Sequence, residues 1–236
     1  MAERKSVQIA SSTIKAISFD IEPTLVCSKK QKDALWENIL KEHFSSEFAH
    51  YCHQQFHQLR HKNYLKQCEN GIYPTLDELY SMIMKNIIEE NLLDIDQNEA
   101  MQILHDSMLI RPLHKDVSAS VLTSLAIDVY VISLGSQKWL PSSILTLPVN
   151  EIYLTDERKC PKYHDVHSLF NLACSENNVK PSEWLHVSSQ YSDLVYADKH
   201  GLKTCWLNRN GEYWNHLFRP DFEISSIESL MSIIEK

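Results

Sequence analysis

Apolar and polar positions follow two different patterns along this chain, and the patterns separate it into parts. From Thr13 to Phe19, β-favouring apolar residues form a short run that ends at Asp20, as expected for a buried strand. From residue 29 to about residue 113, apolar residues instead recur every three or four positions, which predicts a block of four helices. Beyond residue 113, short apolar runs alternate with helical patterns, which predicts a parallel sheet with helices on both faces.

Local signals predict the individual elements. Thr75 followed by Glu78 is typical of a capping box, and Asp96 opens another helix. Past the helical block, we expect strands at residues 127–133, 152–155, 184–188, 204–207 and 222–226, and helices at 116–124, 166–177, 194–200 and 227–234. The predicted fold class is α/β: a Rossmann-like doubly wound parallel sheet with an inserted helical-bundle cap. Its expected divisions are a core of residues 13–27 and 114–236, a cap of residues 28–113, and a flexible N-terminal arm of residues 1–12.

Composition narrows the classes of function. The net charge of −8 and the pI of about 5.8 argue against broad electrostatic binding to nucleic acid and favour a small anionic substrate or a protein partner. With only 4 Gly, the chain has no Gly-rich phosphate loop. Its 6 Cys form no Cys-x-x-Cys pair, and no apolar stretch has the length of a secretion signal or a membrane span. We therefore expect a cytoplasmic protein that does not bind a membrane.

The chemistry begins where the first strand ends. Asp20 and Glu22 stand on one short loop with Thr24 beside them, at the sheet edge where open α/β folds bind ligands. An aspartate there can act as a nucleophile, and an acid two residues further on can act as a proton donor.

This loop resembles the first motif of the haloacid dehalogenase-like (HAD) superfamily, Asp-x-Asp-x-Thr-Leu, with Glu22 at the second acid. Ser133-Leu-Gly-Ser136 is similar to the second motif. Val187-Ser-Ser-Gln-Tyr-Ser-Asp193 is similar to the fourth motif, although a Ser-Ser pair replaces Gly-Asp as it does in haloacid dehalogenases. Gly201-Leu-Lys-Thr-Cys-Trp-Leu-Asn-Arg209 is close to a dehalogenase-type segment. The resemblance covers nearly the whole chain and implies the HAD fold.

The resemblance also implies roles for particular residues. A lysine should hold the nucleophile and the substrate's charge, and Lys159, Lys162 and His164 compete for its position; counting forward from the preceding strand favours Lys162. The implied catalytic residues are Asp20, Glu22, Thr24, Ser133 and Lys162. The implied Mg²⁺ ligands are Asp20, Glu22 and Asp193, and the implied substrate-binding residues are His57, Ser136, Ser188 and Gln190.

Departures from the family pattern leave three functions open. Phe56-His57-Gln58 stands where dehalogenases have Trp-Arg-Gln. His57 is mostly neutral at pH 7 and would substitute poorly for the positively charged arginine of that motif. Leu134 replaces an Asn, and Pro23 removes a backbone N–H beside the anion site. We favour a hydrolase with an Asp nucleophile acting on a small phosphorylated metabolite. The alternatives are a metal-independent haloacid dehalogenase-like hydrolase and a catalytically impaired HAD fold that serves as a protein-binding module.

Two further expectations concern the cap. His50, His53, His57 and His61 fall along one helical stripe, which suits either a Zn²⁺ or Ni²⁺ site or, as we favour, a polar helix face. The resemblance to dehalogenases also implies a homodimer formed through the cap.

Overall fold

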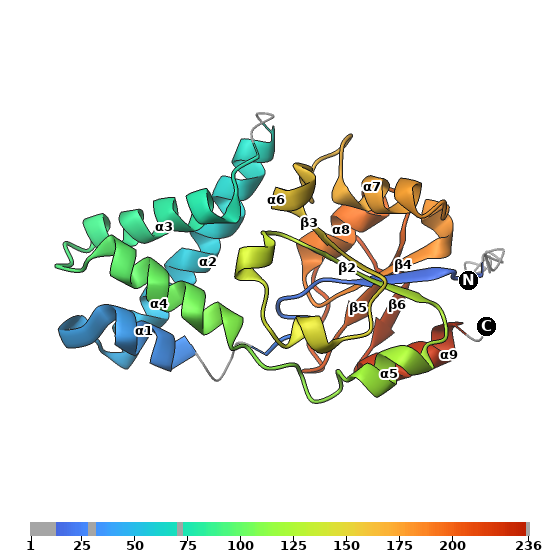
Figure 1. The fold of residues 1–236 in the computed structure, drawn as a ribbon, viewed down its shortest axis with the longest axis horizontal. Coiled ribbons are helices and arrows are strands. Elements are labelled where there is room, and N and C mark those ends of the chain that lie inside the picture. Colours follow the sequence, from blue (N-terminus) through green and yellow to red (C-terminus); the bar gives the residue numbers. More distant parts are fainter. Residues whose placement is uncertain (1–12, 28–31, 70–72, 235–236) are drawn as a thin grey trace, which may run out of the picture.

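A parallel sheet flanked by helices forms one part of the molecule, and four helices form the other (Figure 1). The computed structural model describes residues 13–27, 32–69 and 73–234. The predicted N-terminal arm and the first four residues of the predicted cap lie outside the described residues.

The sheet has six parallel strands in the order β3-β2-β1-β4-β5-β6. The strands are β1 (Ala16–Phe19), β2 (Asp128–Ser133), β3 (Glu151–Leu154), β4 (Trp184–Ser188), β5 (Lys203–Leu207) and β6 (Phe222–Ile224). The order reverses beside β1, and ligands of open α/β sheets bind in the crevice at such a reversal. Phe19 stands level with Val131 and Val187, so the carboxyl ends of β1, β2 and β4 meet at one edge.

Alternate residues of β1 face two separate apolar layers. Ile17 and Phe19 belong to the buried cluster that contains Leu122 of α5 (Ala119–Ser124), against which Met231 of α9 (Met231–Ile234) also packs. On the opposite face, Ala16 belongs to the cluster beneath α7 (Leu169–Glu176) and α8 (Tyr191–Lys199). Figure 1 shows these helix pairs on opposite sides of the sheet, which confirms the predicted Rossmann-like class.

The cap consists of α1 (Lys32–Leu40), α2 (Ser46–Glu69), α3 (Leu76–Glu90) and α4 (Gln97–Leu109). The expected capping box at α3 is present: the Thr75 hydroxyl accepts from the Glu78 N–H, and the Glu78 carboxylate accepts from the Thr75 N–H at 2.9 Å. The cap's apolar cluster also contains Trp139 and Tyr163, which come from the sheet-bearing part of the chain. The two parts of the molecule therefore share one apolar contact region.

Some boundaries differ from the expected ones. Helix α5 begins at Ala119 because Ser118 caps it, whereas the Asp116 carboxylate accepts hydrogen bonds from Arg209 and from the Ile227 N–H. The short α6 (Thr155–Arg158) was not expected. No helix in the described part of the chain is long and apolar enough to cross a bilayer.

Candidate active site

Four side chains from distant parts of the sequence meet at the carboxyl edge of the sheet. The Lys162 ammonium lies 2.6 Å from Oδ1 of Asp20 and 2.8 Å from Oδ1 of Asp193. The Ser133 hydroxyl donates to the same Oδ1 of Asp20 at 3.2 Å. Oδ2 of Asp20 accepts no hydrogen bond from the described residues, which leaves this oxygen available for chemistry.

Asp193 is fully engaged within this cluster. Its Oδ1 accepts from Lys162 and from the Tyr163 hydroxyl, and its Oδ2 accepts from the Ser188 hydroxyl at 2.8 Å. Both Lys162 and Asp193 are completely buried. The charges of Lys162 and Asp193 therefore compensate each other within the protein.

The acid–base properties of the cluster follow from its burial and its charges. Burial, followed by the neighbouring Asp193 carboxylate, raises the pKa of Asp20 to about 7, although Lys162 opposes the shift. Burial would raise the pKa of Asp193 too, but Lys162 lowers it below its usual value. Burial acts to lower the pKa of Lys162, and the two aspartates raise it above its usual value. Lys162 and Asp193 thus form a charged pair, and Asp20 is the member that titrates near neutrality.

A cavity of about 360 Å³ opens above Asp20 between the sheet edge and the cap. Its floor contains Asp20 and Ser133, and α2 contributes His57, Arg60 and His61. Apolar and aromatic side chains make up much of the remaining wall: Val26, Tyr64, Leu76, Tyr80, Met108, Leu134, Trp139, Leu140, Leu154 and Tyr163. The cavity is thus a mostly apolar pocket with few polar groups, as is typical of small-molecule sites.

Glu22 does not fit its predicted role as a proton donor. Its carboxylate forms an ion pair with Arg111 and lies 3.8 Å from the Arg60 guanidinium. Burial alone would raise the pKa of Glu22, but Arg111 and then Arg60 lower it to about 2. A carboxyl group with this pKa holds no proton to donate at neutral pH.

Arg60 and Arg111 are pocket residues that the sequence analysis missed. Arg60 follows His57 by three residues and therefore lies on the same face of α2. Arg111 follows α4 and precedes Pro112, in a segment that the sequence marked only as the connection between the cap and the core. The signal that could have found Arg60 was its helical spacing from His57.

The other predicted site residues divide into two groups. His57, Ser136 and Gln190 line the cavity, and burial followed by Arg60 lowers the pKa of His57 to about 3, so its ring is neutral. Thr24 and Ser188 are completely buried and are not among the cavity-lining residues. These two correct the predicted assignment: the Thr24 hydroxyl accepts from the Ser189 N–H at 3.0 Å, and the Ser188 hydroxyl holds Asp193, so both brace the loops beneath the cavity.

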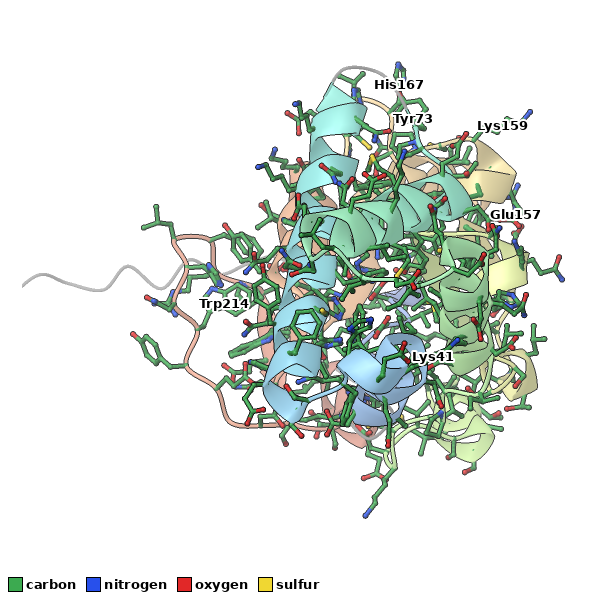
Figure 2. The ribbon with its side chains drawn as sticks, turned by 90° about the vertical axis from the view of Figure 1, so that its left-hand side faces the viewer. Lys41, Tyr73, Glu157, Lys159, His167 and Trp214 are labelled. Carbon is green, nitrogen blue, oxygen red and sulfur yellow. The ribbon has the colours of Figure 1, made fainter. Side chains whose placement is uncertain are left out.

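Of the three candidates for the lysine that holds the nucleophile, only Lys162 lies beside Asp20. Lys162 contacts Asp20 directly. Lys159 is exposed, and Figure 2 shows it at the outer edge of the molecule. His164 accepts from the N–H groups of Val166 and His167 in a surface turn.

Other contacts already occupy much of the predicted Mg²⁺ ligand set. The Lys162 ammonium lies between the Asp20 and Asp193 carboxylates, and the Glu22 backbone carbonyl accepts from the Gln190 side-chain amide. No cluster of three or more His, Cys, Asp or Glu residues with metal-binding geometry occurs among the described residues. The histidine stripe likewise makes other contacts, since His50 bonds Lys32 at 2.7 Å and His53 accepts from Trp36 at 3.3 Å.

Comparison with known proteins defines the fold. No protein-family model and no curated protein sequence matches this chain. Among solved structures, a dehalogenase with an intermediate complex is similar at 20% identity and a TM-score of 0.78, covering 95% of this chain and 98% of its own. The L-2-haloacid dehalogenase of Xanthobacter autotrophicus, with chloropropionic acid covalently bound, is 17% identical with a TM-score of 0.78. The match covers 94% of this chain and 98% of the dehalogenase chain. YfnB of Bacillus subtilis, described as a putative HAD-hydrolase and bound to magnesium, is 18% identical with a TM-score of 0.70. The match covers 95% of this chain and 100% of the YfnB chain.

These likenesses confirm the resemblance drawn from the sequence at the level of the fold. The chain has the HAD fold with a helical cap, and structures similar to it include L-2-haloacid dehalogenases.

Proposed function

We propose that this protein is a metal-independent hydrolase in which Asp20 displaces a leaving group from a carbon atom of a small organic anion. The observation that carries the proposal is the position of Lys162, whose ammonium group lies within 2.8 Å of both buried aspartates. This built-in cation compensates one of the two carboxylate charges at the site without a bound metal. The similarity to dehalogenases, one of which carries a covalently bound chloropropionic acid, supports the same reaction class.

The residues divide the work as follows. Oδ2 of Asp20 attacks the carbon, the bond to the leaving group breaks, and the leaving group departs with the electron pair. Lys162 and Ser133 hold Oδ1 and orient the carboxylate for attack. Water then hydrolyses the resulting ester, which restores Asp20 and releases the hydroxylated product with one proton.

The phosphatase that the sequence analysis favoured suits these residues less well. It would need a protonated acid and a Mg²⁺ site, whereas Glu22 is ionised by its arginine partners and Asp193 is held by Lys162, Tyr163 and Ser188. The magnesium of YfnB belongs to that protein. No particular observation favours the binding module, which the following experiment also tests.

The experiment measures halide release from 2-chloropropanoate by the purified protein, with and without EDTA, beside phosphate release from a panel of phosphorylated metabolites with added Mg²⁺. We expect chloride release that EDTA does not change, and none by Asp20→Asn. A matched control is Asp165→Asn, which alters an exposed carboxylate outside the cavity and should leave the rate unchanged.

Single-turnover reaction in H₂¹⁸O provides a second readout. An ester intermediate transfers one labelled oxygen into Asp20, which mass spectrometry of the peptide detects. Phosphate release that requires Mg²⁺ would contradict the proposal and favour the phosphatase. Turnover of neither substrate class would also contradict it and favour the binding module.

A further inference from the structure

Two buried hydroxyl groups hold the backbone of Lys162. The Ser168 hydroxyl donates to the Lys162 carbonyl oxygen at 2.8 Å, and the Tyr64 hydroxyl accepts from the Lys162 N–H at 3.1 Å. Lys162, Ser168 and Tyr64 are all buried, so both bonds lie in the low-dielectric interior, where they are strong. The point from which the lysine side chain starts is therefore fixed on both sides of the residue.

The two hydroxyl groups come from different parts of the molecule. Ser168 caps α7 in the sheet-bearing part and stands 6 residues after the lysine. Tyr64 lies on α2 of the cap and stands 98 residues before the lysine. The cap thus holds the backbone N–H of Lys162, although the ammonium group of this residue acts on carboxylates at the sheet edge.

The ring of Tyr64 also contacts the residue that follows the lysine. The rings of Tyr64 and Tyr163 are packed edge to face, with centroids 5.7 Å apart and planes at 88°. The Tyr163 hydroxyl donates to Asp193, which is the second ion partner of Lys162. Tyr64 therefore contacts the lysine backbone and also the residue that orients the second carboxylate.

The position of the ammonium group is critical for the site. The group lies 2.6 Å from Oδ1 of Asp20, so a shift of about 1 Å would end this hydrogen bond. Without the Tyr64 hydroxyl, the Lys162 N–H would be a buried donor that lacks its partner, which is costly. The backbone would then move to recover a partner, and the side chain would move with it.

We propose that Tyr64 is a positioning residue: its hydroxyl fixes the Lys162 backbone and, through it, the place of the ammonium group between Asp20 and Asp193. The cap then supports the lysine in addition to lining the cavity, to which the Tyr64 side chain also contributes. This inference rests on the proposed function where it concerns the reaction rate, whereas the placement of the ammonium group is measured without turnover.

The first test uses Tyr64→Phe, which keeps the ring and removes the hydroxyl. In protein labelled with ¹³C and ¹⁵N, NMR follows the backbone N–H of Lys162 and its ammonium group, which is assigned through the bonds of the same residue. We expect the N–H to exchange with solvent at least about tenfold faster than in the wild type, and the ammonium protons at least about threefold faster. Ammonium exchange equal to that of the wild type would overturn the inference.

Two control variants separate positioning from general support of the cap. Asp156→Ala removes another hydrogen bond between cap and core, which the Leu76 N–H donates at 2.9 Å. Tyr51→Phe removes an exposed hydroxyl from the same helix as Tyr64. We expect Asp156→Ala and Tyr64→Phe both to lower the thermal unfolding midpoint, but only Tyr64→Phe to change ammonium exchange in Lys162. An equal change in Asp156→Ala would show that Tyr64 only seats the cap, and would overturn the inference.

Kinetics separates failure of this inference from failure of the proposed reaction. We expect Tyr64→Phe to lower kcat for chloride release from 2-chloropropanoate at least about fivefold and to leave KM within about twofold. A raised KM with unchanged kcat would show that Tyr64 binds the substrate instead, and would overturn the positioning role. Faster ammonium exchange in Tyr64→Phe, without chloride release by the wild type, would overturn the reaction and leave the positioning role intact.

Discussion

The Asp20 carboxyl group has a pKa raised to about 7 by burial and by Asp193, which makes the proposed nucleophile sensitive to pH. Only the deprotonated carboxylate attacks, and its fraction increases as pH passes upward through the pKa. We therefore expect kcat/KM for chloride release to rise with pH, to reach half its plateau near pH 7, and to stay constant above about pH 8. Initial rates in buffers of constant ionic strength measure this profile, and a rate that stays flat down to about pH 5 would contradict it.

Lys162 should be essential to stability as well as to the site. Lys162→Met leaves two buried carboxylates without their cation, and removal of one partner from a buried ion pair costs about 3–5 kcal/mol. Urea unfolding of both proteins measures the loss.

The pH dependence of that loss tests its cause. Without Lys162, burial and mutual repulsion raise the pKa values of Asp20 and Asp193 above their unfolded values, so the folded variant binds more protons than the unfolded chain. The variant should therefore recover part of its stability as pH falls from about 8 to about 5. Lys159→Met, which changes an exposed lysine, is the matched control and should unfold like the wild type; an equal loss in both variants would contradict the argument.

At the residue scale, the sequence predicts the acids of the site better than it predicts their partners. Asp20 and Ser133 stand at strand ends, so their convergence follows from the parallel sheet. The partner of Glu22 could not be predicted, because Arg60 is 38 positions away and Arg111 is 89 positions away in the sequence, and only the packing of the cap brings both to one carboxylate. The resemblance implied that Ser188 binds substrate, but a hydroxyl at a strand end can face either the ligand or the protein, and here it donates to Asp193.

At the scale of elements, the turn after β2 has little tolerance for larger residues. Gly135 has φ of +109°, and a Cβ built there would lie 2.7 Å from the Leu76 side chain of α3. Gly135→Ala should thus be destabilising by about 1–3 kcal/mol, through both backbone strain and the contact with the cap.

Gly211→Ala separates the two causes in the same measurement. Gly211 also has a positive φ, of +66°, but a Cβ there meets nothing within 4 Å. We expect a smaller loss of unfolding free energy for Gly211→Ala than for Gly135→Ala, measured by thermal and urea unfolding. Equal losses would show that the contact with α3 adds nothing.

The elements themselves follow closely from the hydrophobic pattern. Strand β4 begins and ends at the predicted residues, Trp184 and Ser188, and the start of α3 follows from Thr75 and Glu78. Helix α8 begins three residues before its predicted start, because its first turn, Tyr191-Ser192-Asp193, carries site residues rather than an apolar repeat. Local signals fix most boundaries, and they fail where a residue makes tertiary contacts instead of continuing the local repeat, as Asp193 does in α8 and Asp116 does before α5.

At the scale of the whole molecule, the cap and the core should unfold together. Trp139 and Tyr163 of the core are buried in the apolar cluster of the cap, and the Leu76 N–H at the start of α3 donates to Asp156 at 2.9 Å. We expect urea unfolding followed by far-UV circular dichroism and by tryptophan fluorescence to give coincident transitions. Two separated transitions would show that the cap is an independent folding unit.

The lysine between the two aspartates has a consequence for how the protein becomes active. An ammonium group attached to the chain arrives with the polypeptide itself, so the centre is complete at the moment folding ends. Under the proposed metal-independent reaction, we expect maturation to need no insertion factor and no supply of ions, so that freshly synthesised protein is as competent as aged protein.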